Sequence, residues 1–341
     1  MLAGVGEEAG DLGEFELIKR LLARVGPLVA DVLIGPGDDA AAVRLGPGAT
    51  LATSDLLLEG VHFEFGLSSP ADVGWKALAV NLSDIAAMGG APRYALVSLG
   101  APAAVPVATL EALYDGIGEC AGSFGVSVIG GDTVRADRVI VSVAVLGEAG
   151  HAGMVTRSGA RPGDVLCVTG SVGGAAEGLS LLQAAGDDPQ AAGLLTQFPG
   201  LAVAHQRPTP RTREGQTAAG CGATAMIDVS DGLAADVCHI CEASGVGVEI
   251  REASIPLPDG FRETARWAGV DPLGMALGGG DDYELAIAIP AAQVSQLVEA
   301  LAPTVVTPIG EFVGSERVAV RADGTREPLD ALGWDHFKEE P

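Results

Sequence analysis

Each half of this chain carries the same two short acidic motifs, in opposite order along the sequence. The first half contains Gly-Asp-Asp at residues 37–39 and Asn-Leu-Ser-Asp at residues 81–84. The second half contains Asp-Val-Ser-Asp at residues 228–231 and Gly-Asp-Asp at residues 280–282. Such acidic turns usually carry function. We therefore predict a fold in which both halves contribute carboxylates to one site.

Segments with strand and helix patterns alternate along the chain. Apolar residues recur at helical spacing over residues 13–25, and an apolar run from Pro70 to the Gly89-Gly90 pair predicts a buried helix. Further strand or helix segments, with the turns that lead into them, are expected at residues 30–35, 49–60, 93–101, 107–125, 126–134, 138–149, 157–170, 171–182, 224–245, 246–250 and 275–290. The alternation predicts an α/β (α+β layered) fold. A composition change near Gly150 predicts a two-domain subunit, divided into residues 1–148 and 149–341.

The composition restricts both the core and the partners. Aromatic residues make up 4% of the chain and hydrophobic residues 48%, so the core must consist mainly of Ala, Val, Leu and Ile, which suits helices packed closely on sheets. The formal net charge of −25 repels nucleic acid and anionic membrane surfaces, so neither is expected as a partner. Solubility accounts for much of this acidity, but not for the many aspartates beside glycines.

The five cysteines and the first residues favour a reducing compartment. No basic and apolar export signal is recognisable, and no uncharged apolar stretch is long enough for a membrane span. We therefore expect a cytoplasmic protein with reduced thiols. Cys238 and Cys241 have the C-x-x-C spacing, but no second pair stands at the distance of a zinc site, so we interpret them as packed inside a helix.

Aspartates beside glycines, at turns or at strand ends mark the candidate chemistry. They are Asp38, Asp39, Asp55, Asp84, Asp132, Asp228, Asp231, Asp281 and Asp282. Each one alone could be a helix cap or a turn residue, and we expect all of them at strand ends or in helix-start turns. Clustered carboxylates repel one another unless a cation neutralises them, and Mg²⁺ favours a few carboxylates together with waters and substrate phosphates. The set as a whole therefore predicts Mg²⁺ sites that handle phosphate.

Common phosphate-binding and nucleophile motifs are missing from the sequence. It has no G-x-x-x-x-G-K-[ST] loop, no complete dinucleotide-binding pattern, no His-Arg-Asp kinase loop and no G-x-S-x-G elbow. A glycine-rich segment over residues 168–179 could hold an anion at a helix start, or its glycines could permit close packing of a helix on a sheet. Both interpretations stay open at this point.

Several longer strings together resemble the thiamine-monophosphate kinases, a family in the superfamily of aminoimidazole ribonucleotide synthetase and selenophosphate synthetase. They run from about Gly13 to Phe337 and read GEFELI, GPGDDAA, SDLLLEGVHF, KALAVNLSDIAAMGGAP, VIGGDTVR, TRSGARPGD, IDVSDGLAAD, GGGDDYEL and GWDHF. The most specific are NLSDIAAMGG, IDVSDGL and GGGDDYEL in this order, followed by GWDHF. A departure is Leu56-Leu57, which replaces a more polar stretch.

The resemblance implies ATP-dependent, Mg²⁺-dependent phosphorylation of thiamine monophosphate to thiamine diphosphate. It also implies a homodimer that associates through the N-terminal sheet, with metal and ATP bound by the N-terminal domain. By motif matching, the ligands of several Mg²⁺ ions would be Asp39, Thr53, Ser54, Asp55, Asp84, Asp132, Asp228 and Asp231. The contacts to ATP would be Tyr114, Gly131, Asp132, Arg157 and Ser230. The contacts to the substrate would be His62, Asp281 and Trp334.

The chemistry of these residues agrees with such a reaction. The acceptor would be a phosphate monoester with a second pKa of about 6, so its oxygen is already a nucleophile at neutral pH and no residue is expected as a general base. Mg²⁺ ions between aspartates and phosphates would reduce their repulsion and align a direct in-line transfer without a phospho-enzyme. Arg157 could add paired donors on the nucleotide phosphates, and Asp281 or Trp334 suits the cationic thiazolium ring.

Two alternatives are kept beside this interpretation. The first is another ATP-dependent enzyme of the superfamily, such as aminoimidazole ribonucleotide synthetase, which shares the shorter motifs. Selenophosphate synthetase would carry a reactive Cys or selenocysteine near the N-terminus, whereas the first cysteine here is Cys120, and a hydrogenase-maturation carbamoyl dehydratase would end in Cys, where this sequence reads FKEEP. The second alternative is a non-catalytic Mg²⁺-nucleotide-binding module, which would lack some of the matched aspartates, and none is missing.

Overall fold

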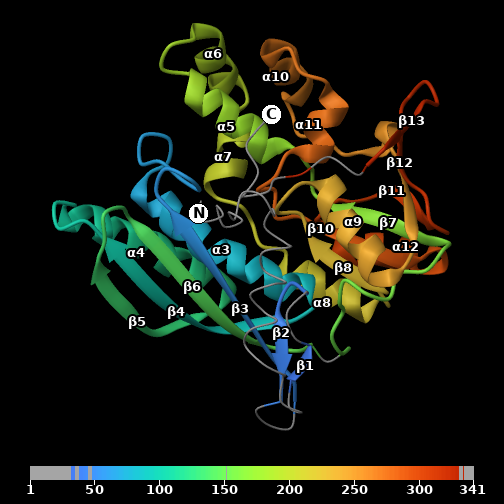
Figure 1. Ribbon diagram of the computed structural model, residues 1–341, viewed down its shortest axis with the longest axis horizontal. Coiled ribbons are helices and arrows are strands. Elements are labelled where there is room, and N and C mark those ends of the chain that lie inside the picture. Colours follow the sequence, from blue (N-terminus) through green and yellow to red (C-terminus); the bar gives the residue numbers. More distant parts are fainter. Residues whose placement is uncertain (1–31, 35–37, 45–47, 151, 330–332, 334–341) are drawn as a thin grey trace, which may run out of the picture.

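The computed structural model contains two β-sheets that are joined through a central helix (Figure 1). It describes residues 32–34, 38–44, 48–150, 152–329 and 333. The helix expected at 13–25 lies outside the described residues. The mixed two-sheet architecture confirms the predicted α/β layered fold.

The first sheet has the strand order β1-β2-β3-β6-β4-β5. Its strands are β1 (Val32–Ile34), β2 (Ala41–Val43), β3 (Thr50–Leu58), β4 (Ala91–Ala101), β5 (Ser127–Arg135) and β6 (Ile140–Glu148). All neighbouring strands are antiparallel except the parallel pair of β4 and β5. β3 and β6 are paired along their whole length, from Thr50 opposite Glu148 to Leu58 opposite Ile140, which fixes which side chains share a face.

The second sheet has the order β13-β12-β9-β11-β7-β10-β8. Its strands are β7 (Asp164–Thr169), β8 (Ala225–Asp228), β9 (Gly247–Arg251), β10 (Leu285–Pro290), β11 (Val306–Val313), β12 (Arg317–Val320) and β13 (Arg326–Pro328). The short strands β7 and β10 and the edge strand β8 are buried and almost entirely apolar, as is typical of a sheet that helices cover on both sides.

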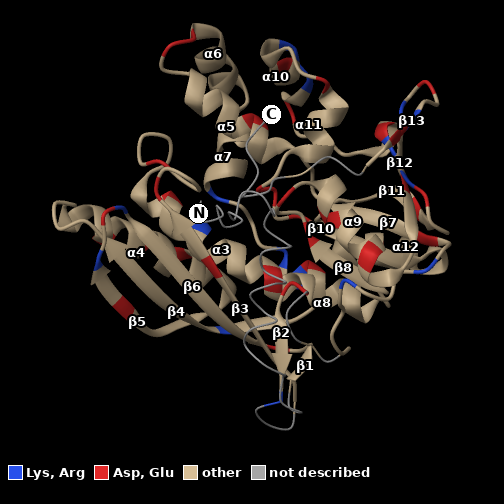
Figure 2. Ribbon diagram, viewed as in Figure 1, with Lys and Arg blue, Asp and Glu red and all other residues tan. Residues whose placement is uncertain are grey.

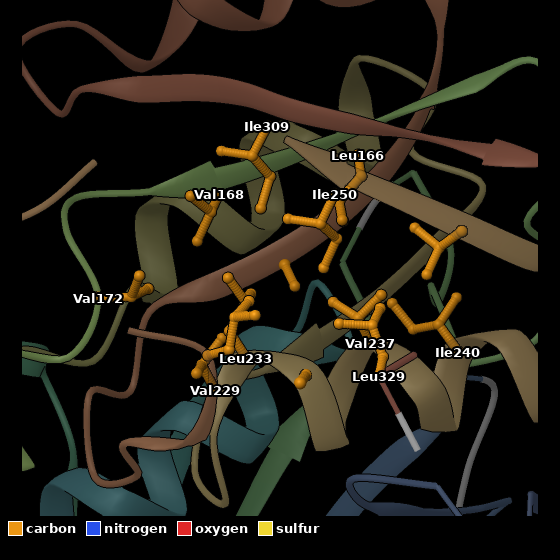
Figure 3. Packing of buried hydrophobic residues seen from close by; sticks show 14 of the residues in the cluster. Leu166, Val168, Val172, Val229, Leu233, Val237, Ile240, Ile250, Ile309 and Leu329 are labelled. Carbon is orange, nitrogen blue, oxygen red and sulfur yellow. The ribbon is translucent and has the colours of Figure 1, made fainter. Parts of the chain in front are cut away.

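Among the residues that the structure describes, helices cover both faces of the second sheet but only one face of the first. The helices are α3 (Pro70–Ala87), α4 (Val107–Phe124), α5 (Gly174–Ala184), α6 (Pro189–Gln197), α7 (Pro199–Gln206), α8 (Thr212–Gly220), α9 (Leu233–Ser244), α10 (Phe261–Ala268), α11 (Pro272–Gly278) and α12 (Val294–Leu301), with short 3₁₀ turns η1 (Glu252–Ser254) and η2 (Ala291–Gln293). On β7, Leu166 and Val168 pack toward α9 (Figure 3), whereas Cys167 packs toward α8 and α12. This alternation is the period of two expected of a strand.

Helix α3 lies between the two sheets (Figure 1) and packs against α4, β3, α8 and β8. Its start is defined by a capping box, in which the Ser69 hydroxyl accepts from the Asp72 backbone and the Asp72 carboxylate accepts from the Ser69 backbone, with Pro70 at the first helical position. The chain leaves the helix at Gly89, whose φ of 66° is left-handed. The predicted helix over this segment is confirmed.

Close packing of α3 on α4 depends on two glycines. A Cβ at Gly74 would lie 1.8 Å from the Leu113 carbonyl oxygen, and a Cβ at Gly116 would lie 1.8 Å from the Ala71 carbonyl oxygen. The two helix backbones therefore touch directly, and this contact fixes the position of α3 between the sheets.

The open face of the first sheet carries exposed apolar side chains. Leu56, Tyr94, Leu96 and Val134 are between 40% and 56% exposed, and every residue of the edge strand β5 is exposed. Exposed apolar side chains grouped in this way are typical of contact surfaces. Among the described residues, no helix is long and apolar enough to cross a bilayer.

None of the five cysteines forms a disulfide in the structure, and their thiols serve packing. Cys238 and Cys241 lie on α9, and Cys241 belongs to the buried core beneath the second sheet. Burial raises the pKa of the Cys241 thiol to about 12, which keeps it protonated at neutral pH.

Candidate functional site

Three aspartates from distant parts of the chain meet at the junction of the two sheets. Asp39 follows β1, Asp84 lies on α3 and Asp228 ends β8, and one carboxylate oxygen of each lies within 4.8 Å of the others. Asp39 and Asp228 are buried and Asp84 is partly buried. Figure 2 shows acidic residues near α3 and β8, between the two sheets. The expectation that acids from both halves of the sequence come together is therefore met by these three residues.

The electrostatics of the cluster call for a cation. Burial, and then the charges of Asp55, Asp228 and Asp39, raise the pKa of Asp84 well above its usual range. Burial and the neighbouring Asp39 do the same to the pKa of Asp228. Carboxylates this close cannot all stay ionised without compensation. Within the described part of the chain, no other group of acids, His or Cys converges in this way, and an all-oxygen donor set fits Mg²⁺.

Arg157 closes one side of the cluster. Its Nε and one terminal nitrogen donate to the two oxygens of Asp39 at 3.1 and 2.9 Å, which is a paired guanidinium–carboxylate contact. The Arg157 backbone N–H points at the carboxylate of Asp38. Burial and the charge of Asp39 raise the pKa of Asp38 to about 6. The two neighbouring acids of the first Gly-Asp-Asp turn therefore have different partners.

Strand β3 supplies the next side chains. Thr53 and Asp55 stand two residues apart on the face of β3 that meets α3, where the Thr53 hydroxyl donates to Asp84. Asn81 on α3 accepts from the Asp55 backbone at 3.0 Å and locks the strand to the helix. Burial raises the pKa of Asp55. The side chain of Ser54 is exposed and points from the opposite face, so it does not join this group within one chain.

The Asp-Val-Ser-Asp turn after β8 is organised by a residue that sequence reasoning missed. One carboxylate oxygen of the buried Asp236 accepts from the backbone N–H groups of Ser230, Asp231 and Gly232 at 3.0 to 3.2 Å. Asp236 reaches back from the first turn of α9, as a capping acid does. An acidic residue five positions after Asp231, at a helix start, was the sequence feature that could have indicated this role.

The second Gly-Asp-Asp turn sends its side chains in different directions. Asp281 pairs with Lys76 of α3, with Nζ 2.7 Å from Oδ2. The hydroxyl of Tyr283 donates to the other oxygen of Asp281 at 3.1 Å. Burial, followed by the charges of Asp281, Asp55 and Asp228, raises the pKa of Tyr283.

The glycine-rich segment before α5 receives an anion from the chain itself. The Asp282 carboxylate accepts from the backbone N–H groups of Gly173 and Ala175 at the helix start. A Cβ at Gly173 would also lie 2.6 Å from the Phe261 ring. Both interpretations of the glycines therefore apply, and the anion is a carboxylate of the protein. Burial raises the pKa of Asp282 to about 7.

An open pocket of about 1150 Å³ lies beside α7 and the 256–260 loop, and none of the three clustered aspartates lines it. Asp282 and Glu284 line one wall with Arg211. Glu284 accepts from Arg211 Nε at 2.7 Å and from the Thr169 hydroxyl at 2.6 Å, which satisfies a mostly buried carboxylate.

Several predicted contacts are not close to the acid cluster in one chain. Asp132 lies on β5, at the level of Leu56 but three strands away, which is about 14 Å at ordinary strand spacing. Gly131 is its neighbour, and Tyr114 is 40% exposed on α4. His62 follows β3, where its Nδ1 accepts from the Leu58 backbone. Trp334 lies outside the described residues.

The expectation that all these acids sit at strand ends or in helix-start turns is wrong for three of them. Asp84 lies inside α3, and Asp55 and Asp132 lie in the middle of β3 and β5. The helix continues through Asn81 and Asp84 because their polar atoms find partners on β3 at the junction. A buried helix that carries such side chains delivers them to a site without a loop.

Sequence reasoning also missed Lys76, Asn81, His205 and Tyr283. Lys76 and Asn81 are polar residues within a helix whose sequence is otherwise largely apolar, and this pattern could have indicated a function. In the structure both are buried. His205 of α7 and Tyr283 are of interest because both lie next to Asp281 in the folded chain. No spacing in the sequence indicates these contacts.

With this geometry established, similarity to known proteins can be interpreted. Residues 37–149 match the AIR synthase related protein, N-terminal domain, and residues 161–323 match the AIR synthase related protein, C-terminal domain. The thiamine-monophosphate kinase of Bacillus subtilis (strain 168) is 37% identical over 338 residues, which is 96% of this chain and 100% of the relative. That of Mycobacterium tuberculosis (strain H37Rv) is 43% identical over 276 residues, 80% of each chain.

A solved structure resembles the whole chain. It is described as AaThiL complexed with AMPPCP and TMP, and it is 33% identical, with a TM-score of 0.83 over 98% of this chain and 100% of that one. The likeness therefore extends over both sheets.

Proposed function

Because this chain belongs to the thiamine-monophosphate kinase family, we propose that it transfers the γ-phosphate of ATP to thiamine monophosphate, giving thiamine diphosphate and ADP. The observation that carries this proposal is the meeting of Asp39, Asp84 and Asp228 between the two sheets. The similarity to AaThiL complexed with AMPPCP and TMP supports the pair of substrates.

Asp39, Asp84 and Asp228 would hold Mg²⁺, with Thr53 and Asp55 beside them. When bound, Mg²⁺ neutralises the charge between carboxylates and phosphates and favours an in-line approach. The donor set fits this ion, because the oxygens converge within 4.8 Å and burial leaves their charges without water. The other proposed ligands are Ser54, Asp132 and Asp231.

The chain's own residues bind and orient the two substrates. Arg157 already presents a planar pair of donors at the cluster, and we assign it to the ATP phosphates together with Ser230. Tyr114, Gly131 and Asp132 would complete the nucleotide contacts. His62, Asp281 and Trp334 are assigned to thiamine monophosphate.

The transfer needs no general base from the protein. At neutral pH the acceptor phosphate is mostly a dianion, since its second pKa is about 6. One of its oxygens forms the new bond to the γ-phosphorus while the bond from that phosphorus to the β–γ bridging oxygen breaks, and ADP leaves with the electron pair. The contribution of the residues is alignment and charge compensation.

We also propose a homodimer that forms through the open face of the first sheet. Exposed Leu56, Leu96 and Val134 lie on this face. Ser54 and Asp132 lie on the same face, so a second copy seated there would cover two of the proposed ligands. A Leu96→Glu variant should sediment as a monomer where the unchanged protein sediments as a dimer.

A coupled ATPase assay tests the function against its alternatives. ADP release should depend on thiamine monophosphate, whereas thiamine or formylglycinamidine ribonucleotide should not support it. Turnover with the ribonucleotide would favour an aminoimidazole ribonucleotide synthetase, and ATP binding without any turnover would favour a non-catalytic module. An Asp228→Asn variant should fold, bind less Mg²⁺ and lose turnover.

A further inference from the structure

A buried ion pair lies about two helical turns from the acid cluster. Lys76 of α3 is 4% exposed, and its Nζ lies 2.7 Å from Oδ2 of Asp281. The Asp281 side chain is 36% exposed, so one partner of the pair is buried and the other is open to solvent. The pair is therefore reachable from outside although it joins the two halves of the molecule.

One polar atom beside the pair has no partner. His205 of α7 is 4% exposed, its Nδ1 lies 3.6 Å from Oδ2 of Asp281, and this nitrogen makes no hydrogen bond. Buried polar atoms are almost always satisfied, by protein, water or ligand. A buried nitrogen without a hydrogen bond, 3.6 Å from the exposed carboxylate of Asp281, points to a ligand group that completes the polar contacts at this pair.

The backbone at the pair is also strained. Asp281 and Tyr283 have φ values of 68° and 51°, a left-handed conformation that non-glycine residues adopt at a cost. Such strain is kept where the position of a side chain matters for function. Here it holds the Asp281 carboxylate toward Lys76 and the Tyr283 hydroxyl toward Asp281.

The pair is suitably placed for an acceptor. Lys76 and Asp84 are eight residues apart on one helix, which is about 12 Å along its axis. On the side of Asp281, the Tyr283 hydroxyl donates to Oδ1 at 3.1 Å. Lys76 and the acid cluster are therefore held at a fixed separation by one helix.

We propose that the Lys76–Asp281 pair opens when the acceptor binds, so that Lys76 takes the acceptor phosphate and Asp281 takes the cationic ring. This inference rests on the proposed function and adds Lys76 as a substrate-binding residue. An acceptor with both charges replaces one internal ion pair by two. A ligand with one charge leaves Lys76 or Asp281 unpaired, which is costly for a buried group. The pair therefore selects a zwitterionic acceptor.

Calorimetric binding without ATP tests this selection. The probes are thiamine monophosphate, which has both charges, thiamine, which has only the cation, and phenyl phosphate, which has only the anion. The unchanged protein should bind thiamine monophosphate at least 10-fold more tightly than either single-charge probe. A charged hydrogen bond of about 1.5–3 kcal/mol corresponds to about 10- to 150-fold in affinity.

Single substitutions should remove one preference each. Lys76→Met should bind thiamine monophosphate and thiamine with similar affinity, while it still binds thiamine monophosphate more tightly than phenyl phosphate. Asp281→Asn should bind thiamine monophosphate and phenyl phosphate with similar affinity, while it still binds thiamine monophosphate more tightly than thiamine. In kinetics, both variants should raise the KM for thiamine monophosphate by at least 10-fold and leave the KM for ATP unchanged. Lys76→Arg, which keeps the charge, should recover part of the affinity and guards against a folding defect in Lys76→Met.

The matched control is Arg207→Met. Arg207 follows α7 and pairs with Asp72 of α3 and Glu119 of α4, without an ion pair to Lys76 or Asp281, so this variant should keep all probe affinities. If Lys76→Met and Arg207→Met show equal affinities for every probe, the Lys76–Asp281 pair only stabilises the fold and does not bind the acceptor. The inference is then overturned. If the unchanged protein binds all three probes but never phosphorylates thiamine monophosphate, the proposed function fails instead.

Discussion

An Asp84→Asn variant should be more stable than the unchanged protein without metal. The oxygens of Asp39, Asp84 and Asp228 lie within 4.8 Å of one another. Two unit charges at this separation repel by about 3 kcal/mol at an effective dielectric constant of about 20. Asp84 faces two such neighbours, and proton uptake relieves part of the repulsion, as the raised pKa of Asp84 indicates. An amide keeps the shape and an acceptor for Thr53 but carries no charge.

We therefore expect a gain of about 1–3 kcal/mol in the free energy of unfolding in EDTA at pH 8, where the carboxylates are most strongly driven to ionise. This corresponds to a rise of a few degrees in Tm. Mg²⁺ at about 100 times its Kd should stabilise the unchanged protein by about 2.7 kcal/mol and stabilise the variant far less. Thermal unfolding with and without Mg²⁺ measures both effects.

The control is Asp187→Asn, which changes an exposed acid between α5 and α6. It should alter neither the stability in EDTA nor the response to Mg²⁺. The reasoning is refuted if Asp84→Asn is less stable than the unchanged protein in EDTA, or if Mg²⁺ stabilises both to the same extent.

Three further substitutions probe the framework. Burial raises the pKa of Glu177 from 4.5 to about 7, so between these pH values the folded protein keeps a proton that the unfolded chain releases. The free energy of unfolding should therefore fall by up to about 3 kcal/mol as the pH rises from 4.5 to 7. Glu177→Gln should remove this part of the pH dependence, as measured by urea unfolding at a series of pH values. Arg211→Met leaves the buried Glu284 without its cation and should cost about 3–5 kcal/mol, and a loss below 1 kcal/mol would contradict the assignment. Gly116→Ala drives a Cβ into the Ala71 carbonyl and should cost about 1–3 kcal/mol, while an unchanged Tm would show that the α3–α4 contact is looser than described.

The paired acidic motifs allowed much of the site to be predicted from sequence. Asp39, Asp84 and Asp228 each belong to one of the repeated acidic motifs, and their carboxylates meet in the folded chain. A common role in binding a cation explains why these motifs would come together. The alternation of apolar segments likewise predicted the layered fold. Both inferences depend on local sequence, where propensity and spacing are informative.

The remaining features depend on tertiary contacts. Asp282 fills the helix start that could have received a ligand, because β10 brings its preceding turn against α5. Lys76 acquires its role only from Asp281, 205 residues away. The separation of Asp132 from the cluster follows from the strand order, which local patterns do not specify.

The most direct test of the account is ³¹P NMR of ATP and thiamine monophosphate mixed with the protein. With Mg²⁺, thiamine diphosphate and ADP should appear in equal amounts, and neither should form with EDTA or with Asp228→Asn. Release of inorganic phosphate without thiamine diphosphate, or formation of thiamine diphosphate by the metal-free protein, would contradict it.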